Sequence, residues 1–365
     1  MKVIHYSWTA NIGGIERFVI DLVESQRKQG IDSQILVGKE IGDFEEEIRE
    51  KTIPVTCLNL ASGLDYSSTK IIRAIKLFKQ FEVIHIHSFH PLIALAAIRA
   101  KTKIVYTLHG LPPQYSPHNL RRSVIEKLKK FFLNQAINYL TFNSEFTKRN
   151  AEVLYSLRGV PKGVVPNGIC IKAKQNENLL SGELIKRIKN KFIVGTTTRF
   201  TPRKRLDRLV KGFADFASSN NVILLMVGEG TERLSFEKTV SSLGIKDKVI
   251  FAGYQVDVRS YQNIIDIAVY PSAAEPFGLV AIEFYLLGKP VLVFNDGGGL
   301  VEIVSRINKN DIVNSTKELS ERLALYYQDR QMLESQKDRL KKYAQTFDIK
   351  YMTDKFTDIY SNVLA

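Results

Sequence analysis

The sequence contains few cysteines. Cys57 and Cys170 are the only two in 365 residues, and they do not have the spacing of a metal-binding motif. Two cysteines are too few for a disulfide framework, so we expect the protein to work in a reducing compartment.

Long hydrophobic segments are also missing. The longest apolar run, Leu92 to Ile98, is far shorter than the roughly 20 residues that cross a bilayer as a helix. The first residues, Met1 to Tyr6, do not have the pattern of a secretory signal peptide. We therefore expect a cytoplasmic protein that is neither secreted nor membrane-spanning.

Acidic residues are fewer than basic ones, 38 against 52, which gives a net charge of +14. A basic protein attracts polyanions such as nucleic acid, anionic lipid or phosphorylated substrates. The segment 120–133 predicts a basic amphipathic helix, with Val124, Leu128 and Phe131 at helical spacing and flanking basic residues Arg121, Arg122, Lys129 and Lys130. It could lie on an anionic membrane surface, or it could be a solvated helix packed on a core.

Short β-rich runs alternate with helical patterns along the chain, which is typical of parallel sheets covered by helices. In the first half the expected strands are Lys2–Tyr6, Ser33–Val37, Val83–His87, Lys103–Leu108 and Tyr139–Asn143. In the second half they are Phe192–Thr198, Val222–Val227, Val249–Ala252, Ile267–Tyr270 and Val291–Phe294. The sequence therefore predicts two doubly wound α/β domains.

The boundary between the domains is expected near residue 168, where Pro166 and Gly168 interrupt the pattern and a polar stretch follows. The first domain would comprise residues 1–167, completed by a C-terminal helix over residues 349–365, and the second residues 168–348. Ligands of open parallel sheets bind beyond the carboxyl ends of the strands. The loops after the strands are therefore where functional residues are expected.

The loop and helix after the strand Ile267–Tyr270 form the most informative segment. Backbone amides of Phe277, Gly278 and Leu279 at the helix start could receive a diphosphate. Glu275 precedes this helix, and Glu283 is the only ionisable group within it. A carboxylate at position 283 could bind two ribose hydroxyls, or it could point to solvent.

Basic residues cluster after the strand Phe192–Thr198. Arg199 and Lys204 could converge on a phosphate, the first through a planar fork and the second as a point charge. Exposed surface charges are the alternative interpretation.

Three features of the first half are weaker signals. Gly13 and Gly14 follow the first strand, where the backbone could approach a ligand or simply turn tightly. His109 ends a strand and could contact a substrate hydroxyl or phosphate, or be structural. His87 is a candidate for contact with an acceptor at the mouth of a cleft. We expect no metal site at His85, His87 and His90, because no cysteine or acidic ligand is near.

Taken together, these motifs resemble those of the family-4 glycosyltransferases, and the resemblance covers nearly the whole chain. Glu275 to Glu283 is similar to that family's E-x7-E motif, and Arg199 and Lys204 match its paired basic residues. Gly13-Gly14, the segment 107–110 and the segment 165–168 complete the set. The chain departs from the pattern at Thr198, where the family often has glycine, and at Cys170, where it often has aspartate.

The resemblance implies a GT-B architecture, two Rossmann-like domains facing a deep cleft, and a retaining transfer that needs no metal and no cofactor. Arg199 and Lys204 would bind the diphosphate of a nucleotide-sugar donor, assisted by the amides of Gly278 and Leu279. Glu283 would hold the ribose, Glu275 the donor sugar, and His109 would lie near the reacting carbon. UDP is the expected nucleotide.

The acceptor is expected to be a lipid-linked or membrane-associated glycan in the assembly of O-antigen, capsule or lipopolysaccharide. The protein would then lie at the inner face of the plasma membrane as a peripheral protein. A small soluble acceptor, a sugar-nucleotide epimerase and a catalytically silent scaffold are the alternatives. No nucleic-acid-binding motif accompanies the positive charge.

Overall fold

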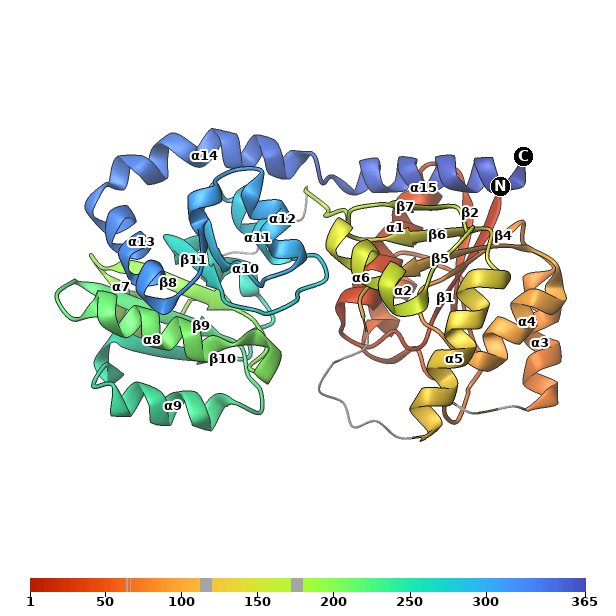
Figure 1. Ribbon diagram of the computed structural model, residues 1–365, viewed down its shortest axis with the longest axis horizontal. Helices are drawn as coiled ribbons and strands as arrows, with labels where there is room; N and C mark the ends of the chain where they lie inside the picture. The colour runs from red at the N-terminus through yellow and green to blue at the C-terminus, as the bar shows by residue number, and fades with distance from the viewer. Residues whose placement is uncertain (64, 66, 112–119, 172–179) are drawn as a thin grey trace. The chain divides into compact units, whose positions relative to one another are not determined.

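The computed structural model describes residues 1–63, 65, 67–111, 120–171 and 180–365, and the side chains of residues 120–122 are outside this description. By its internal contacts the described chain divides into two units. Unit 1 comprises Met1–Cys170 and Phe347–Ala365, and unit 2 comprises Ile171–Thr346. Each unit has one parallel sheet with helices on both faces, as the sequence predicts (Figure 1).

Unit 1 has a seven-stranded sheet in the order β3-β2-β1-β4-β5-β6-β7. Its strands are β1 (Lys2–Ser7), β2 (Asp32–Val37), β3 (Val55–Cys57), β4 (Val83–Ile86), β5 (Lys103–Leu108), β6 (Tyr139–Phe142) and β7 (Lys162–Val164). Its helices are α1 (Gly14–Lys28), α2 (Glu45–Glu50), α3 (Ser68–Phe78), α4 (Pro91–Ala100), α5 (Leu120–Gln135), α6 (Glu145–Tyr155) and α15 (Ile349–Leu364).

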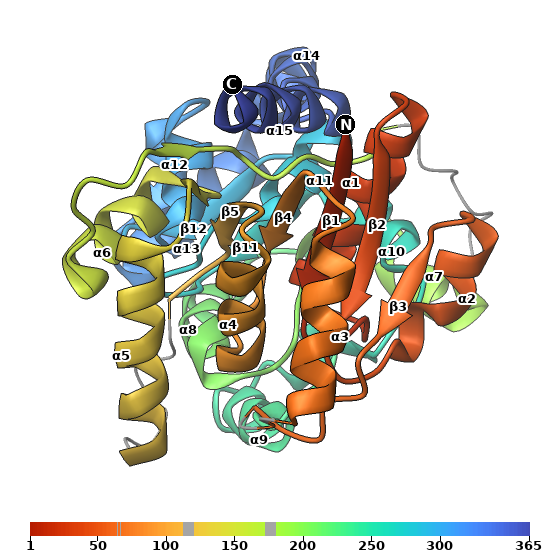
Figure 2. The ribbon, with the colours of Figure 1, turned by 90° about the vertical axis from the view of Figure 1, so that its right-hand side faces the viewer.

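Successive side chains of a strand point to opposite faces, and this gives unit 1 two separate hydrophobic layers. One layer joins Ile4 and Tyr6 of β1 to helices α3–α6, and Figure 2 shows α3, α4 and α5 side by side on one face of the sheet. The other layer joins Val3 to α1, α2 and α15, with Phe18 and Phe356 packed edge to face. The C-terminal helix therefore supplies part of the core of the first unit.

Unit 2 repeats this topology with six strands in the order β10-β9-β8-β11-β12-β13. The strands are β8 (Phe192–Thr197), β9 (Val222–Val227), β10 (Val249–Gly253), β11 (Ile267–Tyr270), β12 (Val291–Phe294) and β13 (Ile312–Val313). The helices are α7 (Gly182–Ile188), α8 (Leu206–Ala217), α9 (Arg233–Ser242), α10 (Val258–Ile264), α11 (Leu279–Leu286), α12 (Gly299–Ser305), α13 (Thr316–Gln328) and α14 (Arg330–Gln345).

All ten strands expected from the sequence are present, with ends shifted by one residue at most. The three strands that the sequence did not indicate are β3, β7 and β13, of three, three and two residues. Runs this short contain no readable alternation of apolar and polar residues. Among the described residues, no helix is long and apolar enough to cross a membrane.

Candidate functional site

The strand order of unit 2 marks one place for a ligand. The chain winds in opposite directions from β8 and β11, which are neighbours in the sheet, so a crevice is expected beyond their carboxyl ends. The loop after β8 contains Arg199 and Lys204, and the loop after β11 contains Glu275 and Gly278. The two segments singled out from the sequence therefore leave adjacent strands at the same edge.

Lys204 and Glu275 form an ion pair that joins these two loops. Lys204 Nζ donates to Glu275 Oε2 at 2.8 Å, and an Arg203 nitrogen lies 3.8 Å from the other carboxylate oxygen. The two side chains of the pair are 18% and 16% exposed. Burial alone would raise the pKa of the Glu275 carboxyl, but Lys204 and Arg203 outweigh it and hold the pKa below its ordinary value.

The backbone around Glu275 is fixed on both sides. Gly299 N donates to Glu275 O at 2.7 Å, and Glu275 N donates to Gly297 O at 3.2 Å. Ala274, with φ +50°, is held by Asp296 O at 2.8 Å. These bonds tie the loop after β11 to the glycine-rich loop after β12, so the carboxylate is held in place by its own main chain.

Helix α11 begins at this site with a backbone position that only glycine can occupy without strain. Gly278 is its N-cap at φ +111°, and a Cβ there would collide with Leu300 Cδ2. Leu279 N and the next amide have no carbonyl to bind within the helix. The Phe277 side chain is 5% exposed, so the site offers backbone amides here rather than side chains.

Glu283 lies inside the unit rather than in open solvent. It is half-buried, and its Oε2 accepts a hydrogen bond of 2.8 Å from Nε2 of Gln262, which is 4% exposed. Burial raises the pKa of the Glu283 carboxyl, and the bond from Gln262 opposes this only in part. The alternative of a solvent-pointing carboxylate is therefore wrong.

Arg199 differs from Lys204 in its surroundings. Its side chain is exposed, and it makes no ion pair or side-chain hydrogen bond with any residue that the structure describes. Two basic residues five positions apart thus have different roles in the resting protein: one is paired across the loops, and the other is available to an anion.

In unit 1, the glycine pair leads into α1. Gly13 is the extended N-cap, and the space that a Cβ would need there is taken by the carboxylate of Glu16. Gly14 is exposed, with open space around it. His109 follows β5 and is half-buried, and its carbonyl accepts a bond from Asn143 Nδ2 at 3.0 Å.

The prediction that His87 contacts an acceptor at a cleft mouth is not supported by its position. His87 is 3% exposed, its Nδ1 lies 3.0 Å from His109 Nε2, and its Nε2 lies 3.1 Å from His5 Nδ1. Both ring nitrogens are therefore used inside the unit, because the side chain points to the sheet face that α1 and α15 cover.

This cluster of histidines was only partly visible in the sequence. Ring nitrogens of His5, His85 and His87 all lie within 4.8 Å of one another. His90 is elsewhere: it caps α4, accepting from Leu92 N at 3.2 Å, and its other nitrogen bonds Ser62 O. His5 was missed, although aligning the strands by their alternation would have placed it opposite His85, its register partner.

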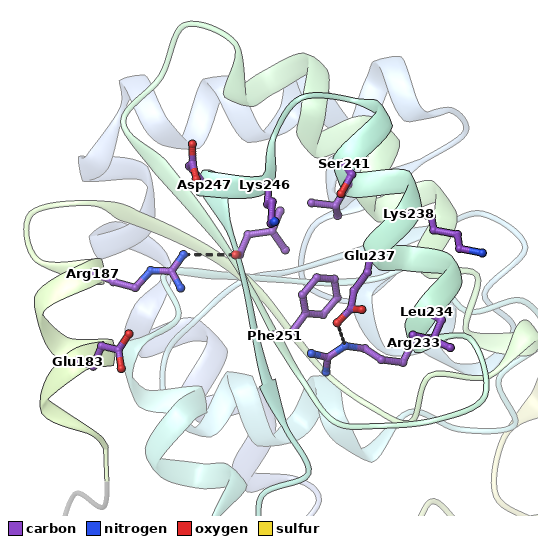
Figure 3. Close-up of a pocket in the computed structure, with 12 residues that line it drawn as sticks. Glu183, Arg187, Arg233, Leu234, Glu237, Lys238, Ser241, Lys246, Asp247 and Phe251 are labelled. Atoms are coloured by element: carbon purple, nitrogen blue, oxygen red, sulfur yellow. Dashed lines mark hydrogen bonds and ion pairs between the residues drawn. The ribbon is translucent and has the colours of Figure 1, made fainter.

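A concave surface of unit 2 lies apart from these loops, between α7, α9 and β10 (Figure 3). Arg233 bonds Glu237 at 2.7 Å within it, and Arg187 bonds the carbonyl of Val249 at 3.5 Å. Its lining contains none of the residues singled out from the sequence, and its charges are of mixed sign.

Two family models match the chain and together span most of it. "Glycosyltransferase Family 4" matches residues 12–172, and "Glycosyl transferases group 1" matches residues 183–347. The first match lies in unit 1 almost entirely, and the second in unit 2, where it includes Arg199, Lys204, Glu275 and Glu283.

Curated relatives are glycosyltransferases of low identity. The chain is 26% identical to the uncharacterized glycosyltransferase YqgM of Bacillus subtilis, over 64% of each chain. It is 23% identical to the O-antigen biosynthesis glycosyltransferase WclY of Escherichia coli, over 94% of this chain and 97% of that protein.

Solved structures share the fold. Anabaena HepE, crystallised with UDP and with UDP-glucose, superposes with a TM-score of 0.82 at 21% identity, covering 99% of this chain and all of that one. WaaG, a glycosyltransferase involved in lipopolysaccharide biosynthesis, has a TM-score of 0.74 at 16% identity, covering 98% and 99%.

Proposed function

Because this chain belongs to the family-4 glycosyltransferases, we propose that it transfers a sugar from a nucleotide-sugar, bound at the loops after β8 and β11, with retention of configuration. The Lys204–Glu275 pair at the strand switch point is the observation on which the proposal depends. The pair holds a cation suited to a diphosphate next to a carboxylate suited to sugar hydroxyls.

Each group has a distinct part in this proposal. The exposed guanidinium of Arg199 binds the diphosphate, and Lys204 with the α11 amides neutralises it as it leaves. Glu275 accepts bonds from the donor sugar, and Glu283, held by Gln262, accepts from the ribose hydroxyls. Two cations and a helix terminus supply the electrostatic stabilisation, so we propose a reaction that needs no metal ion and no other cofactor.

For the nucleotide and the acceptor we propose UDP and a lipid-linked glycan of cell-surface polysaccharide. HepE was crystallised with UDP-glucose, WclY is named for O-antigen biosynthesis, and WaaG for lipopolysaccharide biosynthesis. These relatives support the proposal at the level of substrate class.

A thermal-shift screen tests the donor site. The purified protein is heated with UDP, GDP, ADP, CMP and their common sugar conjugates, and a ligand that binds only the folded state raises the melting temperature. We expect the largest rise with UDP and its conjugates. A melting temperature unchanged by every nucleotide would overturn the donor site and favour a catalytically silent scaffold.

Substitutions test whether Arg199 is responsible for the nucleotide-dependent rise in melting temperature. Arg199→Ala should remove the nucleotide-dependent rise, because it deletes an unpaired cation at the phosphate position. Lys211→Ala is the matched control: it removes an exposed basic residue of α8 in the same unit. Equal nucleotide shifts in the two variants would contradict the role of Arg199.

Helix α5 provides a surface for the membrane part of the proposal. Its side chains Val124, Leu128 and Phe131 are 47%, 42% and 63% exposed, while Phe132 and Leu133 are buried in the core. An apolar face turned outward, beside the exposed Lys127 and Lys130, favours an anionic membrane as its partner. A fully packed amphipathic helix would have turned these three residues inward.

One of the basic residues predicted to flank the apolar face of α5 points elsewhere. Lys129 does not flank the apolar face, because its Nζ lies 5.0 Å from the ring centroid of Tyr155. Burial lowers the pKa of its ammonium group, and Glu126 opposes this only in part. Arg121 and Arg122 were also predicted to flank this face, and their side chains are outside the part of the chain that the structure describes.

Liposome flotation tests this surface with vesicles of phosphatidylcholine alone and of phosphatidylcholine with phosphatidylglycerol. We expect binding to the anionic vesicles only, reduced by the double change Leu128→Ser and Phe131→Ser. Leu234→Ser, at a 71% exposed leucine of α9, is the control that should bind as the wild type does. Equal binding to both vesicles, or none to either, would refute the membrane partner.

A further inference from the structure

A row of polar side chains crosses the sheet of unit 1 on the face covered by α1 and α15. His5 and His85 are register partners on β1 and β4, and both are fully buried. Thr107 and Thr141 are register partners on β5 and β6 and are 1% and 0% exposed. Buried polar groups must find hydrogen-bond partners, and here they find one another.

One branch of this network ends at His109, which follows β5. His109 Nε2 lies 3.0 Å from His87 Nδ1, His87 Nε2 lies 3.1 Å from His5 Nδ1, and His5 Nε2 lies 2.8 Å from Gln26 Oε1. Phe18 covers this branch, with its ring centroid 4.7 Å from that of His109. The half-buried His109 is therefore linked to helix α1 through two buried rings.

The rings of this branch are neutral. Burial lowers the pKa of His5 to about 4 and that of His109 to about 3. Burial also holds the pKa of His87 well below its ordinary value, and the neighbouring histidines lower it further. A neutral imidazole has one N–H donor and one acceptor nitrogen, so a chain of such rings has a direction.

Gln26 sets that direction. Its Oε1 also accepts from Ser33 Oγ at 2.6 Å, and an amide oxygen only accepts, so the proton of His5 is on Nε2. His5 Nδ1 then accepts from His87 Nε2, and His87 Nδ1 accepts from His109 Nε2. Every ring in the branch has its proton on Nε2.

The second branch fixes the orientation of that amide, because it begins where Gln26 Nε2 donates to Tyr360 Oη at 3.4 Å. Tyr360 Oη lies 2.6 Å from His85 Nδ1, His85 Nε2 lies 2.6 Å from Thr107 Oγ1, and Thr107 Oγ1 lies 2.6 Å from Thr141 Oγ1. Thr141 donates to the carbonyl of Tyr106 at 3.3 Å, and that carbonyl can only accept. A reversed amide would reverse this branch and leave the Thr141 oxygen facing the carbonyl without a proton.

We propose that Gln26, His5 and His87 are positioning residues that hold His109 as the neutral Nε2–H tautomer, with Nδ1 as an acceptor for a sugar hydroxyl. This inference rests on the proposed transferase function. In the part of the chain that the structure describes, His109 Nδ1 has no partner, so it is the ring nitrogen left for a substrate. An unprotonated diphosphate oxygen cannot donate to it, so His109 selects the sugar and not the phosphate.

Nitrogen NMR of the ¹⁵N-histidine-labelled protein tests the tautomer without any substrate. At neutral pH we expect His109 to have a protonated Nε2 and an unprotonated Nδ1, with the signal assigned by its loss in His109→Asn. A protonated Nδ1 would overturn the proposal. This spectrum is independent of activity, so it can fail while nucleotide binding succeeds, or the reverse.

Ligand additions test the choice of hydroxyl. UDP-glucose should shift the Nδ1 signal, because a sugar hydroxyl donates to it, and UDP alone should leave it in place. An equal shift with both would assign the contact to the diphosphate and overturn the inference. Zinc should leave all ring signals unchanged, and displacement of the His5, His85 and His87 signals would mean that the cluster is a metal site instead.

Gln26→Met tests the positioning role, with Gln29→Met, at the exposed C-cap of the same helix, as control. Without the amide acceptor both proton directions become available, so His109 should show two tautomers and the KM for the donor should rise roughly tenfold. The control should change neither. A single Nε2–H signal and an unchanged KM in folded Gln26→Met would refute the role, and if that variant does not fold, the wild-type spectrum still decides the tautomer.

Discussion

Lys204 and Glu275 are 71 residues apart in the chain, yet they form the contact that defines the candidate donor site. The pair is enclosed enough for the interaction to matter, since each side chain is less than one-fifth exposed. A carboxylate at this depth depends on its cation, because burial alone would raise its pKa. Removing the cation alone should therefore destabilise unit 2.

Lys204→Met should destabilise the protein by about 1–3 kcal/mol, because the Glu275 carboxylate would lose its principal partner while staying buried. Urea unfolding measures this, and Lys211→Met, at an exposed lysine of the neighbouring helix, should change the free energy of unfolding by about 0.5 kcal/mol or less. Equal effects of the two substitutions would show that Lys204 does not stabilise the carboxylate.

At the scale of the element, helix α11 begins where the donor diphosphate is proposed to bind. The turn into the helix requires φ +111° at Gly278 and close packing against Leu300 of α12. Backbone and packing thus position the helix amides together, and Phe277, the residue before Gly278, is buried.

Gly278→Ala should reduce both stability and nucleotide binding, because its Cβ adds a collision with Leu300 to an unfavourable backbone angle. Gly244→Ala is the matched control: its φ is +68°, but nothing lies within 4 Å of a Cβ there. We expect the control to cost about 1 kcal/mol and Gly278→Ala to cost at least about 2 kcal/mol more. Differential scanning calorimetry of both variants checks the difference, and similar losses would argue against a packed turn.

Over the whole molecule, the histidines are unevenly placed. All six occur between His5 and His118, so unit 2 has none. The single tryptophan, Trp8, is also in unit 1, where its ring stacks on His90 with centroids 5.3 Å apart. The fluorescence of Trp8 can therefore report the acid sensitivity that the histidines give to unit 1.

The stability of unit 1 should fall as pH drops below about 6.5, the ordinary histidine value. Burial lowers the pKa of His5 to about 4 and that of His109 to about 3, so the unfolded chain takes up protons first. The contribution of each neutral, buried histidine to the free energy of unfolding is complete above about pH 6.5. It decreases by up to about 1.4 kcal/mol per pH unit as pH falls toward the pKa of that histidine in the folded state.

Urea unfolding followed by Trp8 fluorescence, at about pH 8 and about pH 5, measures this. We expect a clearly lower midpoint at the acidic pH, and a much smaller decrease in any separate transition of unit 2 seen by circular dichroism. A Trp8 midpoint that does not change with pH would contradict the neutral, buried histidine network.

Much of this protein follows from local sequence patterns. Alternation of period two and helical spacing predicted the ten longer strands, since burial on a pleated or helical face leaves a periodic trace in the sequence. The same reasoning placed Arg199, Lys204, Glu275 and Glu283 in the loops and helix after two strands. Their chemistry was readable because parallel strands bring their carboxyl ends to one edge.

Only the tertiary structure decided which of these residues meet. His5 bonds His87 across 82 residues, and Gln26 lies 3.4 Å from Tyr360 across 334, so no local pattern contained the histidine network. The direction of Lys129 and the outward apolar face of α5 likewise depend on neighbours distant in the chain. A sequence determines the periodicity of each element, whereas the partner of a buried polar group is determined by which faces pack together.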